Sequence, residues 1–372
     1  MQQLTGLDAS FLALETANTT GHVGGVCVLD PREAPQPLDL ARLTEVLGER
    51  LPLVPVLRRK LLNVPLGLDQ PYWVDDPDFD IEYHIREIAL PRPGSDAQLS
   101  EQVARLHARP LDHSRPLWEI YLITGLAKRR NAVYTKIHHS AIDGVSGAEL
   151  LTILLDLSPD GRELPPSEPW VPARPPGLVT IATLAAARLA RRPVQTVRIA
   201  NEMVRVLPTL APSVGTLVGG VLGLNRGDGE VIPTAAGRAP ATPFNRPITP
   251  HRRVAFRSVD LDVVKAVKNS CGVSVNDVVL AMCAGGLRRW LTDHDALPEA
   301  PLVAMIPVSV ITAGQGLNIT LVGYLGRLHF GLTSCRELVP DLDTLASYLV
   351  EELELLAKAA APSPAGSARK AK

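Results

Sequence analysis

Cysteine is scarce in this chain of 372 residues, which contains only Cys27, Cys271, Cys283 and Cys335. No two of them form a C-x-x-C pair, and no histidine cluster has metal-ligand spacing. A chain of this length can bury a core without disulfide staples. The sequence therefore predicts four reduced cytosolic thiols and no metal site.

An excess of one charge sign is also missing, because 38 Lys+Arg stand against 39 Asp+Glu. Without a net field to attract phosphate backbones, nucleic acid is excluded as an expected partner. Hydrophobic residues make up 46% of the chain, which excludes disorder throughout and suffices for two domains with cores.

Export and membrane-spanning signals are equally weak. The first fifteen residues have no cationic start and contain Asp8 and Glu15, which a secretory signal would exclude. The longest charge-free run lies between Arg205 and Arg226 and is broken by prolines and glycines. We therefore expect a cytoplasmic protein that is not secreted and has no spanning helix.

Four segments follow one another along the chain. Residues 1–157 alternate β-branched runs with helical patterns, which predicts an N-terminal α/β or α+β domain. Seven prolines between Ser158 and Pro176 open a connector that we extend over residues 158–250. A second domain is expected over residues 251–358, followed by a disordered basic tail at 359–372.

Expected elements of the second domain are a strand at 252–261, a helix at 275–291 and a strand at 302–310. A strand pair turning at Leu325-Gly326 and a final helix at 341–359 follow. Within the connector, the arginines between Arg188 and Arg205 allow two interpretations: a connecting helix with solvated arginines, or an interfacial helix that touches lipid.

One short motif carries the chemistry. The run 131–139 reads as a strand that places His139 on the face of Val133 and Ile137, and His138 on the opposite face. A turn at 141–144 follows, and then Ser146 with Glu149 forms a capping box for the next helix.

A histidine in this place suits a general base. A neutral imidazole, with an ordinary pKa of about 6.5, can take a proton from an alcohol or a thiol within hydrogen-bond reach. Asp143 could fix the loop, and Gly144 could supply a positive φ or room for close approach. The alternative is a pair of hydrogen-bonded structural histidines.

The run His138–Gly144, H-H-x-x-x-D-G, resembles the active-site motif of CoA-dependent acyltransferases and condensation domains. Further stretches resemble the bacterial bifunctional wax ester synthase/diacylglycerol acyltransferases. They are residues 4–15 with His22-Val23-Gly24, 115–119, 275–281, 305–310, 314–320 and 336–343.

This resemblance implies an α/β (α+β) fold of two chloramphenicol-acetyltransferase-like domains, with mixed sheets flanked by helices. It also implies transfer of a long acyl chain from acyl-CoA to the hydroxyl of diacylglycerol or of a long-chain alcohol. Metal, prosthetic group and covalent acyl-enzyme are not expected. Because both acceptors are lipids, peripheral attachment to the inner face of the membrane or to lipid droplets is expected.

By the same resemblance, His139 is the general base, His138 supports the site, and Asp143 with Gly144 holds the loop. Residues of two further motifs are candidate substrate contacts: Asn276, Asp277, Pro116, Leu117 and Trp118. Asp277 could instead cap a helix with Ser274. The 116–118 run could instead be core or tunnel wall, and His22 could line an entrance or make a local structural hydrogen bond.

The chain departs from the family pattern after Val310, where a long segment before the Gly-Leu-Asn-Ile strand is absent. The second domain is therefore expected to be incomplete. Two hypotheses follow: an O-acyltransferase, or a catalytically impaired deletion product that binds lipid or a membrane surface. Condensation on carrier-protein thioesters is a third, because it shares the histidine motif.

Overall fold

The computed structural model describes most of the chain outside the connector. Described are residues 1–34, 36, 38–65, 69–142, 156, 162–165, 170–177, 179–181, 183, 184, 187, 239–304 and 315–361. Every structural statement below concerns these residues.

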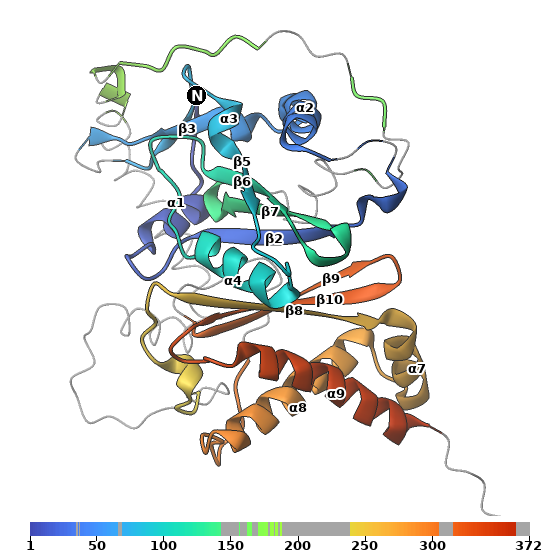
Figure 1. The fold of residues 1–372 in the computed structure, drawn as a ribbon. Helices are drawn as coiled ribbons and strands as arrows, with labels where there is room; N and C mark the ends of the chain where they lie inside the picture. Colours follow the sequence, from blue (N-terminus) through green and yellow to red (C-terminus); the bar gives the residue numbers. More distant parts are fainter. Residues whose placement is uncertain are drawn as a thin grey trace, which may run out of the picture.

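A four-stranded mixed sheet forms the centre of the N-terminal half (Figure 1). Its strands are β2 (His22–Leu29), β7 (Asn131–His138), β6 (Trp118–Thr124) and β5 (Ile85–Ala89), in the order β2-β7-β6-β5. Only β5 and β6 pair in parallel. Strand β7 is buried on both sides, because Val133 and Ile137 belong to one core cluster and Tyr134 to another.

Different elements cover the two faces of this sheet. The Ile137 face packs against helix α2 (Leu40–Arg50) and a small sheet of β1 (Gln2–Gln3), β4 (Tyr72–Asp75) and β3 (Arg59–Leu62). The Tyr134 face packs against helix α4 (Asp96–His107) through an apolar stripe of the helix. A capping box between Ser95 and Gln98 begins α4 and satisfies its first free N–H groups.

A second, three-stranded sheet lies in the C-terminal half. It has the order β8 (Arg252–Asp260), β10 (Arg327–Cys335), β9 (Leu317–Tyr324), and all pairs are antiparallel. Helices α7 (Leu261–Cys271), α8 (Val275–Asp293) and α9 (Leu342–Ala360) cover one face.

Helix α4 joins the two halves. On the face of β8 that α7 to α9 leave free, Val254 and Phe256 pack against the core cluster of α4. Figure 1 shows α4 between the two sheets. Arg252, at the start of β8, also donates a hydrogen bond to the carbonyl of Asn18, in the loop before β2.

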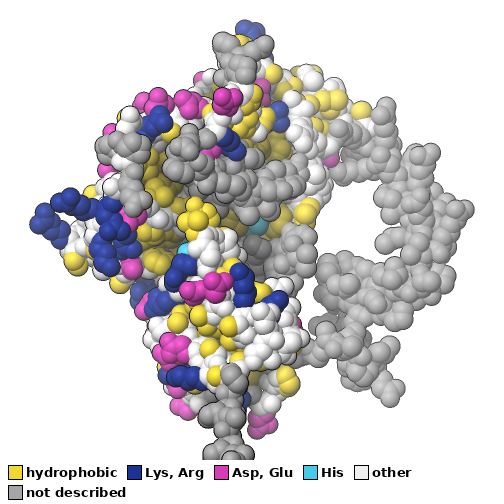
Figure 2. All heavy atoms as spheres, turned by 90° about the vertical axis from the view of Figure 1, so that its right-hand side faces the viewer, with side chains coloured by type: hydrophobic (Ala, Val, Ile, Leu, Met, Phe, Trp, Pro, Cys, Tyr) yellow, Lys and Arg dark blue, Asp and Glu magenta, His cyan; other side chains and the backbone are white. Residues whose placement is uncertain are grey.

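Short elements complete the described part. They are α1 (Gly6–Ala13), α3 (Ile81–His84), and the 3-10 turns η1 (Pro31–Glu33), η2 (Leu51–Leu53), η3 (Pro55–Arg58), η5 (Ala127–Arg129), η6 (His139–Ala141) and η7 (Pro243–Asn245). On the face that Figure 2 shows, basic and acidic side chains are interspersed, as the balanced composition predicts.

Most predicted elements are confirmed. The strand from 252, the helix from 275 and the final helix appear as β8, α8 and α9, and the last strand pair turns at Leu325-Gly326 with φ of 45° and 71°. The four cysteines are free. The mixed sheets flanked by helices confirm the predicted fold class.

Two boundaries were wrong. Strand β7 ends at His138, because the chain tightens into η6 at His139. Helix α9 runs from Leu342 through Ala360, one residue beyond the expected end of the final helix. Of the strand expected at 302–310, residues 302–304 have no regular structure and the rest lies outside the described residues, as does the break after Val310. The predicted domain boundaries and the incomplete second domain stay predictions.

In the part of the chain that the structure describes, no helix alone has the length and hydropathy to cross a bilayer. Helices α7 and α8 meet these criteria only when taken together, and they are bent by 101° at their junction.

Helix α9 offers a matched pair of substitutions that tests the C-terminal core. Leu345 is fully buried, whereas Leu355 is 53% exposed. Leu345→Ala should lower the free energy of unfolding by about 2–5 kcal/mol, because it leaves a cavity. Leu355→Ala should change it by about 0.5 kcal/mol or less. Urea denaturation measures both, and equal losses would contradict the packing of α9.

Candidate active site

The strand pair β2–β7 sets the position of the two histidines. His22 of β2 lies opposite His138 of β7, and the N–H of His139 donates to the carbonyl of Gly21, 2.8 Å away. Beyond this bond the chain turns, and the N–H of Ser140 donates to Nδ1 of His138 at 3.1 Å. The end of β7 is therefore fixed by one bond across the sheet and one to a side chain.

The His139 ring has a buried nitrogen without a partner. Its ring stacks on Phe11 of α1, with centroids 4.7 Å apart and planes 16° apart. Its Nε2 is buried and meets no hydrogen-bond partner among the described residues. Burial, and secondarily the nearby His138, lower the pKa of His139 below its ordinary value. The ring is thus neutral at neutral pH, as a general base must be.

His138 is fully buried and held in one tautomer. Nδ1 accepts from the N–H of Ser140 and lies 2.6 Å from the Ser140 hydroxyl, so the ring proton belongs on Nε2. Nε2 lies 3.2 Å from Oε1 of Glu15, although its N–H does not point straight at that oxygen.

The carboxylate of Glu15 contacts three groups: the ring of His138, the N–H of Gly21 and the ring of His113. Oε1 also accepts the N–H of Gly21 at 2.7 Å, and Oε2 lies 2.9 Å from Nε2 of His113. Burial acts to raise the pKa of Glu15, but the contacts with His113, His138 and Gly21 outweigh it and lower the pKa. The same ion pair raises the pKa of His113. Glu15 is thus a carboxylate anion at neutral pH.

Glu15, His113 and His138 could also be considered as metal ligands, because their donor atoms all lie within 4.8 Å of one another. A metal would need the lone pair of His138 Nε2, whereas the Ser140 N–H, directed at Nδ1, places the proton on Nε2. The described arrangement therefore fits a hydrogen-bonded carboxylate better than a metal centre.

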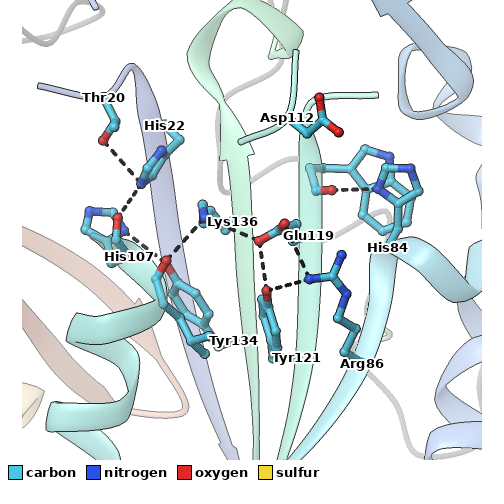
Figure 3. Close-up of polar contacts among 12 residues, drawn as sticks. Thr20, His22, His84, Arg86, His107, Asp112, Glu119, Tyr121, Tyr134 and Lys136 are labelled. Atoms are coloured by element: carbon cyan, nitrogen blue, oxygen red, sulfur yellow. Dashed lines mark hydrogen bonds and ion pairs between the residues drawn. The ribbon is translucent and has the colours of Figure 1, made fainter. Parts of the chain in front are cut away.

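A buried polar network occupies the α4 face of the same sheet (Figure 3). Nε2 of His22 lies 2.7 Å from the carbonyl of His107, and Nδ1 of His107 lies 2.9 Å from the Tyr134 hydroxyl. The fully buried Lys136 donates to the Leu106 carbonyl at 3.2 Å. The C-terminal end of α4 thus receives donors on its free carbonyls.

The network continues through Glu119, next to Trp118 at the start of β6. Its Oε2 accepts from Lys136 at 3.3 Å and from the Tyr121 hydroxyl at 2.9 Å. Arg86 donates to the Tyr121 hydroxyl at 3.2 Å. Since His22 belongs to this network, its local structural hydrogen bond is confirmed.

The motif at 115–119 contributes packing. Pro116, Leu117 and Trp118 are all buried, and the last two belong to the core cluster on the Ile137 face. The indole N–H of Trp118 donates to the Leu57 carbonyl at 2.7 Å, and its ring stacks on His84 at 4.4 Å. The core interpretation fits these contacts, and the substrate-contact interpretation of the three residues stays a prediction.

The second motif begins helix α8. Asp277 forms a capping box with Ser274, which confirms the capping interpretation. Asn276 is exposed, and within the described ranges no hydrogen bond or ion pair joins it or Asp277 to either histidine. Asp143 and Gly144, and the expected Ser146–Glu149 capping box, lie outside the described residues.

Sequence reasoning gave no role to three residues of the site: Phe11, Glu15 and His113. The first two lie in residues 4–15, a stretch that resembles the family without revealing what each side chain contacts. In the structure this stretch reaches the histidines through the stacking of Phe11 on His139 and the contact of Glu15 with His138.

Comparison with solved structures defines the fold class. The chain matches a wax ester synthase/diacylglycerol acyltransferase from Marinobacter aquaeolei VT8 with a TM-score of 0.68 and 26% identity, covering 96% of this chain and 100% of that one. The first condensation domain of the calcium-dependent antibiotic synthetase matches with a TM-score of 0.54 and 18% identity, over 97% and 98% of the two chains. The fold is that of CoA-dependent acyltransferases and condensation domains.

Residues 4–279 match the wax ester synthase/diacylglycerol acyltransferase catalytic domain, and residues 293–357 match the C-terminal domain of the same family. The chain belongs to the wax ester synthase/diacylglycerol acyltransferase family.

Sequence relatives agree with this assignment. A candidate diacylglycerol O-acyltransferase of Mycobacterium tuberculosis H37Rv is 40% identical over 312 residues, which are 83% of this chain and 59% of the relative. Another, from Mycobacterium bovis, is 37% identical over 82% of this chain and 63% of the relative. The chain thus matches less than two thirds of the length of either relative.

The depressed histidine pKa values predict a loss of stability in acid. The pKa of His107 falls from 6.5 to about 4, chiefly through burial, and burial also lowers that of His22. The unfolded chain takes up these protons at higher pH than the folded one, so stability present above pH 6.5 declines as the pH falls towards 4.

Because the His107 ring keeps some exposure, we expect it to contribute about 1 kcal/mol to the decline between pH 7 and pH 5. Urea denaturation at the two pH values measures this decline, and His107→Asn should reduce it. An unchanged decline in the variant would contradict the role of His107.

Proposed function

We propose that the protein is an O-acyltransferase that moves a long-chain acyl group from acyl-CoA to the hydroxyl of diacylglycerol, of a long-chain alcohol, or of both. His139 is the general base. The observation that supports this most directly is the neutral ring of His139, held in η6 directly after β7, with a buried Nε2 that has no partner among the described residues. A buried polar atom left without a partner in a folded protein calls for an explanation, and an incoming hydroxyl provides one.

The chemistry needs only one proton carrier. The imidazole of His139 takes the hydroxyl proton while the acceptor oxygen attacks the thioester carbonyl, forming the new C–O bond. The resulting tetrahedral intermediate collapses, the C–S bond breaks, and the CoA thiolate takes the proton back from the imidazolium. The products are an ester and free CoA, and His139 returns to its neutral form.

His139 is prepared for this role by its surroundings. The Phe11 ring and the bond to the Gly21 carbonyl restrict the ring and the backbone respectively. A base held in place in this way avoids the entropy cost of orientation during each turnover. Asp143 and Gly144 are proposed to hold the loop that follows, and Asn276 to contact substrate.

The proposal predicts that free CoA is released when the protein is incubated with a long-chain acyl-CoA and either dioleoylglycerol or hexadecanol. His139→Ala should reduce the rate about 10²–10⁴-fold, because it removes the proton acceptor. Thiol release followed with a chromogenic disulfide measures the rate, and thin-layer chromatography identifies the ester. Release that is absent in the wild type, or equal in His139→Ala, would overturn the proposal.

The alternative is a catalytically impaired protein that binds lipid or a membrane surface. Its support is the absence, directly after Val310, of the long segment that family members have before the Gly-Leu-Asn-Ile strand. Vesicle sedimentation distinguishes the two functions: binding without CoA release favours the alternative. The arginine-rich stretch 188–205, for which an interfacial helix is one interpretation, lies outside the described residues.

A further inference from the structure

The carboxylate of Glu15 contacts His138, the first histidine of the motif, and also the N–H of Gly21, whose carbonyl accepts the N–H of the second histidine, His139. It lies two residues beyond helix α1 and retains 17% side-chain exposure. A carboxylate this enclosed costs free energy unless it is well paired, and here it is paired three times.

We propose that Glu15 is a positioning residue for His139, which rests on the proposed function. Two connections transmit its effect. Through Oε1 it holds the N–H of Gly21, and the carbonyl of Gly21 accepts the N–H of His139 at 2.8 Å. It also anchors the chain that leaves α1, the helix whose Phe11 stacks on the His139 ring.

A third contact of Glu15, with the ring of His138, limits the movement of that ring next to His139. The Glu15 anion lies 3.2 Å from the protonated Nε2 of His138, while Ser140 occupies Nδ1. His138 is thus held by hydrogen bonds at Nδ1 and lies next to the negative charge of Glu15 at Nε2. His113 completes the cluster at Oε2 of Glu15, 2.9 Å away, and balances the charge of Glu15 when His113 is protonated.

The space around Gly21, where α1, β2 and β7 meet, is also restricted. A Cβ on Gly21 would lie 2.5 Å from His138 Nε2 and 3.2 Å from the Phe11 carbonyl. The chain can bring α1, β2 and β7 this close only where residue 21 has no side chain. Glu15 and Gly21 therefore both affect the place where α1, β2 and β7 meet. Glu15 acts through its charge, and Gly21 acts because it has no side chain.

The test replaces Glu15 with Gln, which keeps the shape but removes the charge. The neutral amide accepts the Gly21 N–H more weakly than the carboxylate does, and its NH2 group cannot accept from His113 or His138. We expect kcat of Glu15→Gln to fall about ten- to hundredfold with KM for acyl-CoA within about twofold, because the base is misplaced while binding is not affected. The NMR signal of the His139 ring, assigned by its loss in His139→Ala, should also move as its stacking on Phe11 changes.

Asp76→Asn is the matched control. Asp76 is also a buried carboxylate of the N-terminal half, but its partner is Lys60 of β3, 2.7 Å away. Its loss should lower the melting temperature without changing kcat or the His139 signal. Equal kcat in Glu15→Gln and wild type, or an equal fall in Asp76→Asn, would overturn the proposal.

Gly21→Ala supplies a second route should Glu15→Gln not fold. It should reduce kcat and move the His139 signal, whereas Gly331→Ala in β10, where an added Cβ meets nothing within 4 Å, should do neither. If the His139 signal of Gly21→Ala stays where it is in the wild type, close packing at residue 21 does not position the His139 ring.

Two further outcomes are decisive. If the wild type transfers no acyl group, the proposed function fails, but movement of the His139 signal in Glu15→Gln still decides whether Glu15 positions the ring. If the wild type, equilibrated with Zn²⁺ and gel-filtered, retains one zinc per chain that Glu15→Gln lacks, the cluster is a metal site and the positioning role is overturned.

Discussion

The position of the candidate base depends on the hydrogen bond that the His139 N–H donates to the Gly21 carbonyl. It lies at the last step of the β2–β7 pairing, where the register places His22 opposite His138. Strand β7 is central in its sheet and buried on both faces, so its end cannot shift without disturbing two cores. The backbone position of the candidate base therefore depends on an interior strand of the N-terminal sheet.

The two faces of that strand serve different purposes. On one, Leu117 and Trp118 join an apolar core against α2 and the small sheet. On the other face, polar groups are buried together and satisfy one another's hydrogen bonds. Lys136 donates to Glu119, and His22 contacts the His107 carbonyl at the end of α4. Such a network is costly if any partner is lost, and it fixes the place of α4 between the two sheets.

Several elements could be predicted from residues near one another in the chain. The cap of α8, the turn at Leu325-Gly326 and the apolar spacing of α9 all follow from local patterns. The end of β7 could not be predicted to the residue, because the turn after His138 depends on Ser140 and Gly21 as hydrogen-bond partners.

By itself, the sequence determined the family, the fold class and the identity of the histidine pair, because each is written in contiguous motifs whose spacing fixes strand, turn and helix. Only the tertiary structure decided what surrounds that pair. Glu15, His113 and His138 are separated by more than a hundred positions at the extremes, and no local periodicity relates them. Sheet pairing brings them within 4.8 Å, where a carboxylate can act on an imidazole.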